Sequence, residues 1–211
     1  MSTDQLGHAR GLVRFRFPVF PESLDVMDRV VENVNVRASS TVIIMRGLPG
    51  SGKTTMAAEL AYLAQRVYGR PTHICSADEY LYNGQGEYEW SPERLAAAHD
   101  CCFDEFKETL ENNVFTVIVD NTNIRHNEYE RYATEARLAG YCLLFVTFRC
   151  SGFNTALAFY DLSQRAIPRL QLQRWYERYL HEYRMVGAVV VEVNNGTMQN
   201  DFCEVHDYFI R

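Results

Sequence analysis

The chain has 211 residues, a formal net charge of −6 and a hydrophobic content of 47%. This length allows one domain with room for an extension. The acidic balance excludes general binding to nucleic acid through a basic surface, so any polynucleotide contact must be local. No segment approaches the roughly 18 apolar residues of a membrane span, and we expect no membrane contact.

The cysteines indicate a reducing compartment. Six are present, without C-x-x-C or Cys/His zinc spacing, and we interpret them as reduced thiols that lie mostly in the core. The expected location is the cytoplasm or the nucleus. Arg10, Arg14 and Arg16 give the first residues a slight likeness to a transit peptide, which keeps a mitochondrial location as an alternative.

Residues 1–38 are predicted to form an N-terminal extension, and residues 39–211 the main domain. Alternating apolar residues predict a short strand over 12–17, which Pro18 ends. Apolar residues then fall on one face of a predicted helix over 22–34. This extension carries no candidate catalytic residue.

The next segment matches the phosphate-binding loop pattern G-x-x-x-x-G-K-[ST]. An apolar, β-branched run over 42–45 predicts a buried strand before the loop, and apolar residues at helical spacing follow it. This context favours a nucleotide site over an ordinary glycine turn, with ATP or another nucleoside triphosphate as ligand. Lys53 is expected to reach the β- and γ-phosphates, and Thr54 to ligate Mg²⁺. The predicted loop comprises Gly47, Leu48, Pro49, Gly50, Ser51, Gly52, Lys53, Thr54 and Thr55.

Helices and strands alternate through the rest of the chain. This alternation predicts an α/β fold, with a parallel sheet core and helices on both faces. Ser91 and Pro92 form a helix start, and Gly140 forms a helix stop. The predicted strands cover 72–75, 115–120, 141–148 and 186–193. The predicted helices cover 92–110, 127–138, 155–165 and 170–183. Residues 81–90 are predicted to form a loop outside the core.

Polar residues follow three predicted strands, at 47–54, 76–79 and 120–123. In parallel sheets, ligands bind beyond the carboxyl ends of the strands. Asp78 and Asp120 are therefore candidates to accept a proton or to hold Mg²⁺. The alternatives are a helix N-cap for Asp78 and a turn-forming role for Asp120.

Together, GLPGSGKTT, SADEY, GEYEW, the A-H pair on the following helix and VDNTN resemble the polynucleotide-kinase-like P-loop family over about residues 41–184. This family includes 5′-hydroxyl polynucleotide kinases, kinase modules of RNA-repair ligases and the P-loop half of cyclic nucleotide phosphodiesterases. The resemblance implies a P-loop NTPase fold with a helical lid. It also implies that Asp78 is the general base and that Arg165 is a lid arginine that clamps the transferred phosphate. Asp120 is expected to orient the waters of the metal because it is an acid that follows a hydrophobic strand, the Walker-B pattern. A solvated charge at a helix end is the alternative for Arg165.

The sequence departs from the family at two positions. Leu81 replaces an arginine that contacts the substrate phosphate, and Asn121 replaces an aspartate. Arg125 and His126 could substitute, or could face solvent at a helix start. His99 is interpreted either as a buried histidine or as a substrate contact. The candidate substrate-binding residues are His99, Asn121, Asn123 and Arg125.

The resulting functional hypothesis is ATP-dependent phosphoryl transfer to the 5′-hydroxyl of RNA or DNA. Tyrosines near Asp78 could stack on a base, or could be surface residues of a lid. Arginines near the last predicted helix could give the local basic strip that a nucleic acid needs. The alternatives are a small-molecule kinase acting on a nucleoside or sugar, and a non-catalytic ATP-binding adaptor. No H-x-[ST] pair, D-x-D motif or ligase-type lysine site occurs, so the sequence resembles a kinase module alone.

Overall fold

The computed structural model describes residues 40–66, 69–89, 91–163, 169–181, 189–194 and 205–206. Its centre is a six-stranded sheet in the order β2-β3-β1-β4-β5-β6. The first five strands are parallel, and the short β6 is antiparallel to β5. The strands are β1 (Thr41–Arg46), β2 (Thr72–Cys75), β3 (Thr116–Val119), β4 (Cys142–Arg149), β5 (Val189–Asn194) and β6 (Val205–His206).

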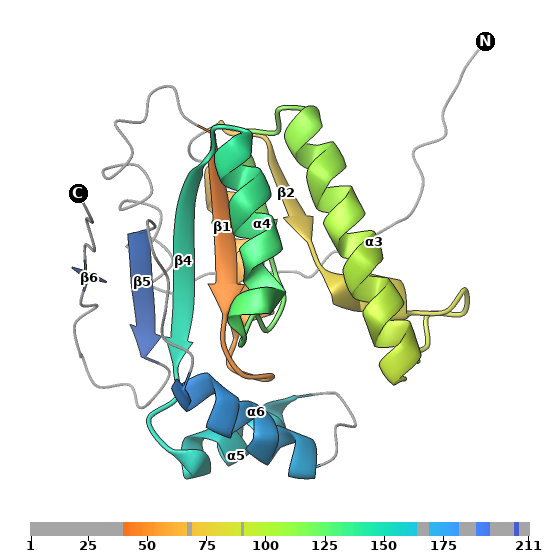
Figure 1. Cartoon of the computed structure of the whole chain (residues 1–211), viewed down its shortest axis with the longest axis vertical. Helices are drawn as coiled ribbons and strands as arrows, with labels where there is room; N and C mark the ends of the chain where they lie inside the picture. The colour runs from red at the N-terminus through yellow and green to blue at the C-terminus, as the bar shows by residue number, and fades with distance from the viewer. Residues whose placement is uncertain are drawn as a thin grey trace.

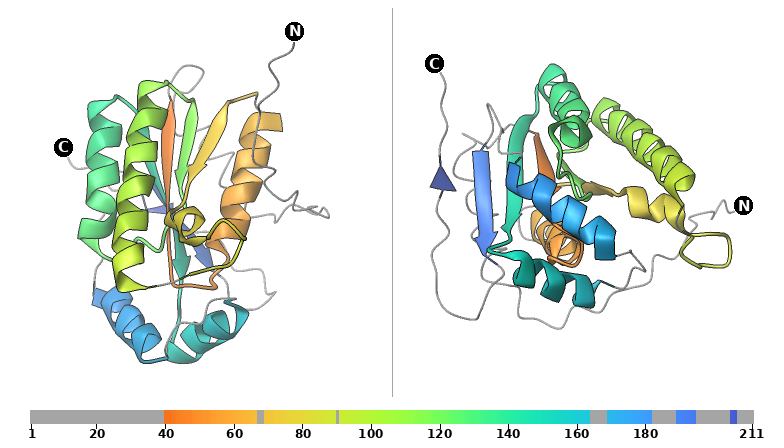
Figure 2. Two further views of the ribbon diagram at one scale, coloured as in Figure 1. Left: turned by 90° about the vertical axis from the view of Figure 1, so that its right-hand side faces the viewer. Right: turned by 60° about the horizontal axis from the view of Figure 1, so that its bottom comes forward.

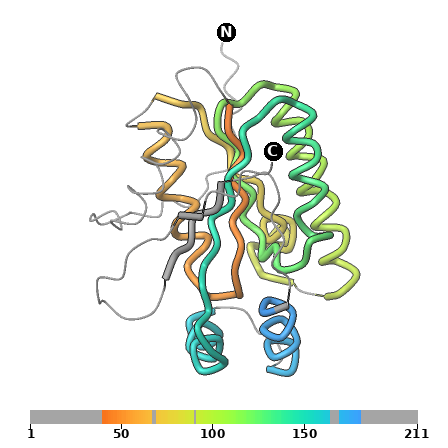
Figure 3. The backbone as a smooth tube through the Cα atoms, turned by 60° about the vertical axis from the view of Figure 1, so that its left-hand side comes forward, coloured from red at the N-terminus to blue at the C-terminus, as the bar shows by residue number. Residues whose placement is uncertain are grey.

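Helices cover both faces of this sheet. Figure 2 shows α2 on one face and α3 with α4 on the other. Two further helices, α5 and α6, lie beyond the carboxyl ends of the strands (Figures 1 and 3). The helices are α2 (Lys53–Arg66), the 3₁₀ helix η1 (Ala77–Leu81), α3 (Pro92–Glu111), α4 (His126–Leu138), α5 (Phe153–Leu162) and α6 (Arg169–His181).

The strand β1 divides the core into two layers because its successive side chains point to opposite faces. Val42 and Ile44 pack in the cluster that includes the apolar residues of α3 and α4. Ile43 and Met45 pack with the apolar face of α2. All four side chains are fully buried, as a parallel sheet covered on both faces requires. The predicted α/β fold with a parallel sheet core is therefore confirmed.

One predicted loop boundary is wrong. The sequence pattern places Leu81 in a loop outside the core, but this residue ends η1 and is fully buried against α3 and the sheet. The chain then forms a small antiparallel bridge between Tyr82 and Tyr88. Because the segment 81–90 is rich in tyrosine and glycine, the sequence pattern did not identify Leu81 at its start as a core residue.

The predicted strand over 12–17 and helix over 22–34 lie outside the described residues. The other described element ends lie within two residues of the prediction, a difference that is common for helix and strand ends. The predicted ends at residues 165, 183 and 186 lie outside the described residues. Within the described ranges, no helix combines the length and apolar character needed to cross a membrane.

Candidate nucleotide-binding site

The phosphate-binding loop joins β1 to α2. Gly50 and Gly52 have φ angles of 77° and 96°, a region that suits glycine. The first turn of α2 begins at Lys53, so its N–H groups have no carbonyl partner within the helix. These donors and the positive end of the helix dipole form an anion site, which suits the phosphates of a nucleotide.

The backbone of α5 packs directly on this loop at Gly50. A Cβ atom built on Gly50 would lie 1.8 Å from the carbonyl oxygen of Phe159. Leu48 is fully buried in the same region, in a cluster with Phe159 and Tyr179. Packing against α5 and α6 therefore helps to fix the conformation of the loop, in addition to its own glycines.

Lys53, Thr54 and Asp120 form the charged centre of the site. The ammonium of Lys53 donates a hydrogen bond to the carbonyl of Leu48 at 2.8 Å, and its side chain is buried. The Thr54 hydroxyl donates to the Asp120 carboxylate. Burial raises the pKa of Asp120, while Lys53 and Thr54 oppose this rise by stabilising the charged form.

One oxygen of this carboxylate fits a cation. Asp120 is 5% exposed, and its Oδ1 atom has no hydrogen-bond partner among the described residues. A buried carboxylate oxygen without a donor is costly unless a cation or water completes its surroundings. Carboxylate and hydroxyl oxygens are the donors that Mg²⁺ prefers, so Asp120 and Thr54 fit this ion.

Hydrogen bonds connect the segment 120–124, which follows β3, to the end of β1, to the phosphate-binding loop and to η1. The backbone N–H of Gly47 donates to the carbonyl of Thr122 at 3.0 Å, and Asn123 Nδ2 donates to the carbonyl of Met45 at 2.8 Å. Asn121 Oδ1 accepts a hydrogen bond of 3.0 Å from the backbone of Ala77. These bonds hold the phosphate-binding loop and η1 in fixed positions relative to β3.

Asn121 and Asn123 therefore have structural partners. Both residues are buried, and Asn123 has a φ of 47°, which asparagine tolerates better than most residues. Asn121 Nδ2 also lies 3.5 Å from the sulfur of Cys102. The amides position the backbone around the site, and their predicted contact with substrate stays a prediction.

Asp78 lies on η1, beyond the carboxyl end of β2. Its side chain is half-buried, and the Tyr88 hydroxyl donates to its Oδ1 atom at 3.4 Å. The N-cap alternative for Asp78 is wrong, because Ser76 occupies the N-cap position and Asp78 is the second residue of the helix. Asp78 is thus partly exposed to solvent and follows β2, the strand that pairs with the strand preceding Asp120.

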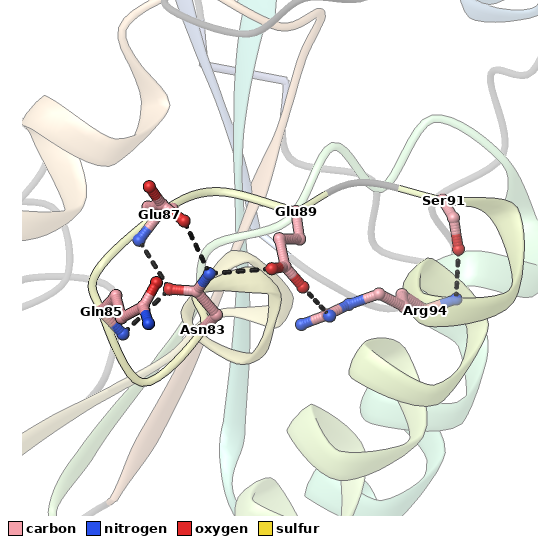
Figure 4. A network of polar contacts seen from close by, with 6 residues as sticks. All are labelled: Asn83, Gln85, Glu87, Glu89, Ser91 and Arg94. Carbon is pink, nitrogen blue, oxygen red and sulfur yellow. Dashed lines mark hydrogen bonds and ion pairs between the residues drawn. The ribbon is translucent and has the colours of Figure 1, made fainter.

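An acidic loop follows η1 (Figure 4). Asn83 organises it, since its Oδ1 accepts from the backbone of Gln85 and Glu87, both at 2.9 Å. Its Nδ2 donates to the carboxylates of Glu87 and Glu89. Glu89 pairs with Arg94 on α3, which ties the loop to the start of that helix.

His99 and Arg125 are the remaining described substrate candidates. His99 is half-buried on α3, and burial, together with the charge of Arg131, lowers its pKa. Its imidazole is therefore neutral at pH 7. Arg125 is half-buried at the start of α4, where its backbone N–H donates to Glu128. The neighbouring His126 is more exposed and pairs with Glu130. Their contact with substrate remains a prediction.

The predicted lid arginine, Arg165, lies outside the described residues, between α5 and α6. Its predicted clamp role remains a prediction. Leu81, in contrast, can be placed. Because it is fully buried, this position contributes no group to a substrate phosphate.

Arg46 is a residue beside the site that sequence reasoning missed. It ends β1 immediately before the loop and is fully buried. Its Nη2 atom donates to the carbonyl of Ile124 at 3.1 Å. The sequence shows an arginine directly after the apolar run of β1, which could have indicated a buried charge. No neighbouring residue identified the carbonyl of Ile124 as its partner.

The fold and the site define a protein of the P-loop nucleotide-binding class. The family model described as "AAA domain" matches residues 42–156, which is more than half of the chain. The chain belongs to this family. The matched region includes the loop, Asp78, Asp120 and the start of α5.

Among curated proteins, human NEDD4-binding protein 2 is 30% identical over 120 residues, which cover 56% of this chain and 6% of that protein. This chain therefore matches only a small part of that relative. A protein described as a "putative kinase" from Chloroflexus aurantiacus has a TM-score of 0.54 at 19% identity, covering 75% of this chain and 87% of its own. The Pnkp1/Rnl/Hen1 RNA repair complex contains a chain with a TM-score of 0.52 at 14% identity, covering 71% and 47%. At these identities, the two structures show a shared fold.

Proposed function

We propose that this protein transfers the γ-phosphoryl group of ATP to the 5′-hydroxyl of RNA or DNA. The observation that carries the proposal is the contrast between two carboxylates at neighbouring strand ends. Asp120 is buried beside Lys53 and Thr54, whereas Asp78 is half-buried and accessible. One carboxylate is suited to a metal ion, and the other to an acceptor hydroxyl.

Each residue then has a defined task. Mg²⁺ held by Thr54 and by waters near Asp120 would neutralise charge on the β- and γ-phosphates. Lys53 adds a second positive charge, and the backbone donors of the loop fix the phosphates in line with the acceptor. Asp78 accepts the proton of the attacking hydroxyl as the new P–O bond forms and the bond to ADP breaks.

The polynucleotide acceptor is supported by the D-N-T-N motif and by the surface near Asp78. Tyr80 and Tyr82 are 39% and 54% exposed, and both lie within four residues of the proposed base. Exposed aromatic rings can stack on nucleic-acid bases regardless of sequence. Such stacking would hold the 5′ end without a strongly basic surface.

The test is transfer of labelled γ-phosphate from ATP to oligonucleotides that carry a 5′-hydroxyl, with 5′-phosphorylated oligonucleotides as the control. Transfer to the hydroxyl form alone supports the proposal. ATP binding without transfer to any acceptor would overturn it and favour the non-catalytic adaptor.

A small-molecule acceptor is the second candidate, and the acidic loop favours it. Glu87 and Glu89 are exposed on this loop, and Leu81 provides no positive charge beside Asp78. Carboxylates repel a phosphate backbone but do not hinder a neutral nucleoside or sugar. Competition between small acceptors and oligonucleotides separates the two candidates, because only polynucleotide transfer should weaken strongly as salt rises.

A further inference from the structure

A cluster of three metal-ligating side chains shares no residue with the centre formed by Lys53, Thr54 and Asp120. The two are neighbours through the backbone, since the Asp120 N–H donates to the carbonyl of Cys75 at 2.9 Å. His73 and Cys75 point to the same face of the edge strand β2, because they are two residues apart. Glu105 reaches them from α3. One ligand atom from each residue lies within 4.8 Å of the others.

The chemistry of these donors is selective. They supply one imidazole nitrogen, one sulfur and one carboxylate oxygen, a set that suits Zn²⁺ and does not suit Mg²⁺. Cys75 is fully buried, while the side chains of His73 and Glu105 are 33% and 22% exposed. The cluster is therefore closed on the sulfur side and open to solvent on the other.

We propose that His73, Cys75 and Glu105 form a binding site for a zinc-like divalent cation. Three protein ligands leave a fourth tetrahedral position for water. The phenol of Tyr80 donates to Glu105 Oε2 at 3.0 Å, so it can orient the carboxylate while Oε1 binds the ion.

The ligand atoms need only small movements to reach this geometry. His73 Nε2 and Glu105 Oε1 are now hydrogen-bonded at 2.7 Å. Ligand atoms around tetrahedral zinc are separated by about 3.3–3.8 Å, given the usual zinc–ligand bond lengths. The ion would therefore separate the histidine from the glutamate slightly and draw the sulfur inwards.

The thiol proton leaves when the ion binds, because Cys75 coordinates as a thiolate. His73 coordinates as the tautomer that carries its N–H on Nδ1 and leaves Nε2 for the ion. Burial and the charge of Glu105 raise the pKa of Cys75, so the thiol is protonated without metal. A bound dication reverses this effect because it stabilises the thiolate directly.

The site would connect three elements near the proposed base. Cys75 ends β2, Glu105 lies on α3, and Tyr80 lies on η1 two residues after Asp78. Sequence spacing alone did not reveal the cluster, because Glu105 is 30 residues beyond Cys75 and belongs to no zinc motif.

The test uses Co²⁺ as a spectroscopic probe on the nucleotide-free full chain. The expected result is one Co²⁺ per protein, with a thiolate-to-cobalt charge-transfer band and the visible bands of a four-coordinate ion. Cys75→Ser should abolish the charge-transfer band. Cys101→Ser is the matched control, because Cys101 is exposed on α3 and outside the cluster, so it should retain the band.

His73→Asn keeps the test valid if Cys75→Ser does not fold, because His73 is partly exposed. This variant should weaken Co²⁺ binding by about 10-fold or more. Zn²⁺ should raise the melting temperature of the wild type but not that of His73→Asn. Absence of a stoichiometric band in the wild type, or its persistence in Cys75→Ser, would overturn the proposal.

Discussion

The guanidinium carbon of Arg46 lies 4.8 Å from the centre of the Tyr179 ring. This contact joins the end of β1, immediately before the phosphate-binding loop, to α6. The Tyr179 hydroxyl in turn donates to the carbonyl of Phe148 on β4 at 2.7 Å. A buried cation and an aromatic ring thus fix α6 against the strand ends that frame the nucleotide site.

The first prediction concerns this contact. Arg46→Lys keeps the positive charge but loses the planar group that stacks on Tyr179 and bonds to Ile124. We expect the free energy of unfolding to fall by about 1–3 kcal/mol, measured by urea denaturation. Tyr179→Phe is the control, since it keeps the ring and loses one hydrogen bond, at about 0.5–1.5 kcal/mol. An unchanged midpoint in Arg46→Lys would show that the planar group is not needed.

The same contact shows what sequence reasoning could reach. The apolar run of β1, the Ser91-Pro92 helix start and the Gly140 stop depend on neighbouring residues, and all three were predicted correctly. The hydrogen-bond partners of Arg46 and Asn123 could not be predicted from neighbouring residues, because each side chain bonds to a residue 78 positions away in the sequence. Such distant pairs follow from the order of the strands in the sheet, which local patterns do not specify.

The second prediction concerns Gly50. An alanine there would be strained by its φ of 77° and would clash with the Phe159 carbonyl. We expect Gly50→Ala to weaken ATP binding by about 10-fold or more, because the loop must move away from α5.

Gly140→Ala is the control that tests the effect of backbone strain without a steric clash. Gly140 has the same φ of 77°, but a Cβ atom built on it would have no neighbouring atom within 4 Å. This control should lose about 1–2 kcal/mol of stability and bind ATP normally, as isothermal titration calorimetry can measure. Equal ATP affinity in the two variants would argue against a tight contact between α5 and the loop.

The third prediction concerns Asp120. Asp120→Asn removes the charge that the metal needs, and should weaken Mg²⁺-dependent ATP binding by about 10–100-fold. The variant should nevertheless be more stable than the wild type at neutral pH. The reason is that burial, which raises the pKa of Asp120, penalises the ionised carboxylate in the folded state.

The pH dependence of this difference has a definite sign. The folded state holds the Asp120 proton more tightly than the unfolded state, where the pKa is near its ordinary value of 3.8. As pH rises above that value and through the raised pKa, the wild type loses stability relative to Asp120→Asn. Thermal melts of both proteins from pH 4 to 8 measure this trend, and parallel curves would contradict it.

The fourth prediction concerns Asp78. Asp78→Asn keeps the shape of the side chain but cannot accept a proton. If Asp78 is the general base, turnover should fall by about 10²–10⁴ while ATP affinity stays near that of the wild type. Lys53→Ala should weaken both, because the ammonium contacts the phosphates before and during transfer.

Tyr88→Phe is the matched control for Asp78, since it removes only the hydroxyl that donates to the carboxylate. This hydrogen bond is long, at 3.4 Å, so its loss should change turnover far less than Asp78→Asn does.

One outcome would contradict the role of Asp78 as general base. If Asp78→Asn lowers the melting temperature but leaves turnover unchanged, Asp78 acts only within η1. The exposed Glu79 would then be the next carboxylate to test as the base.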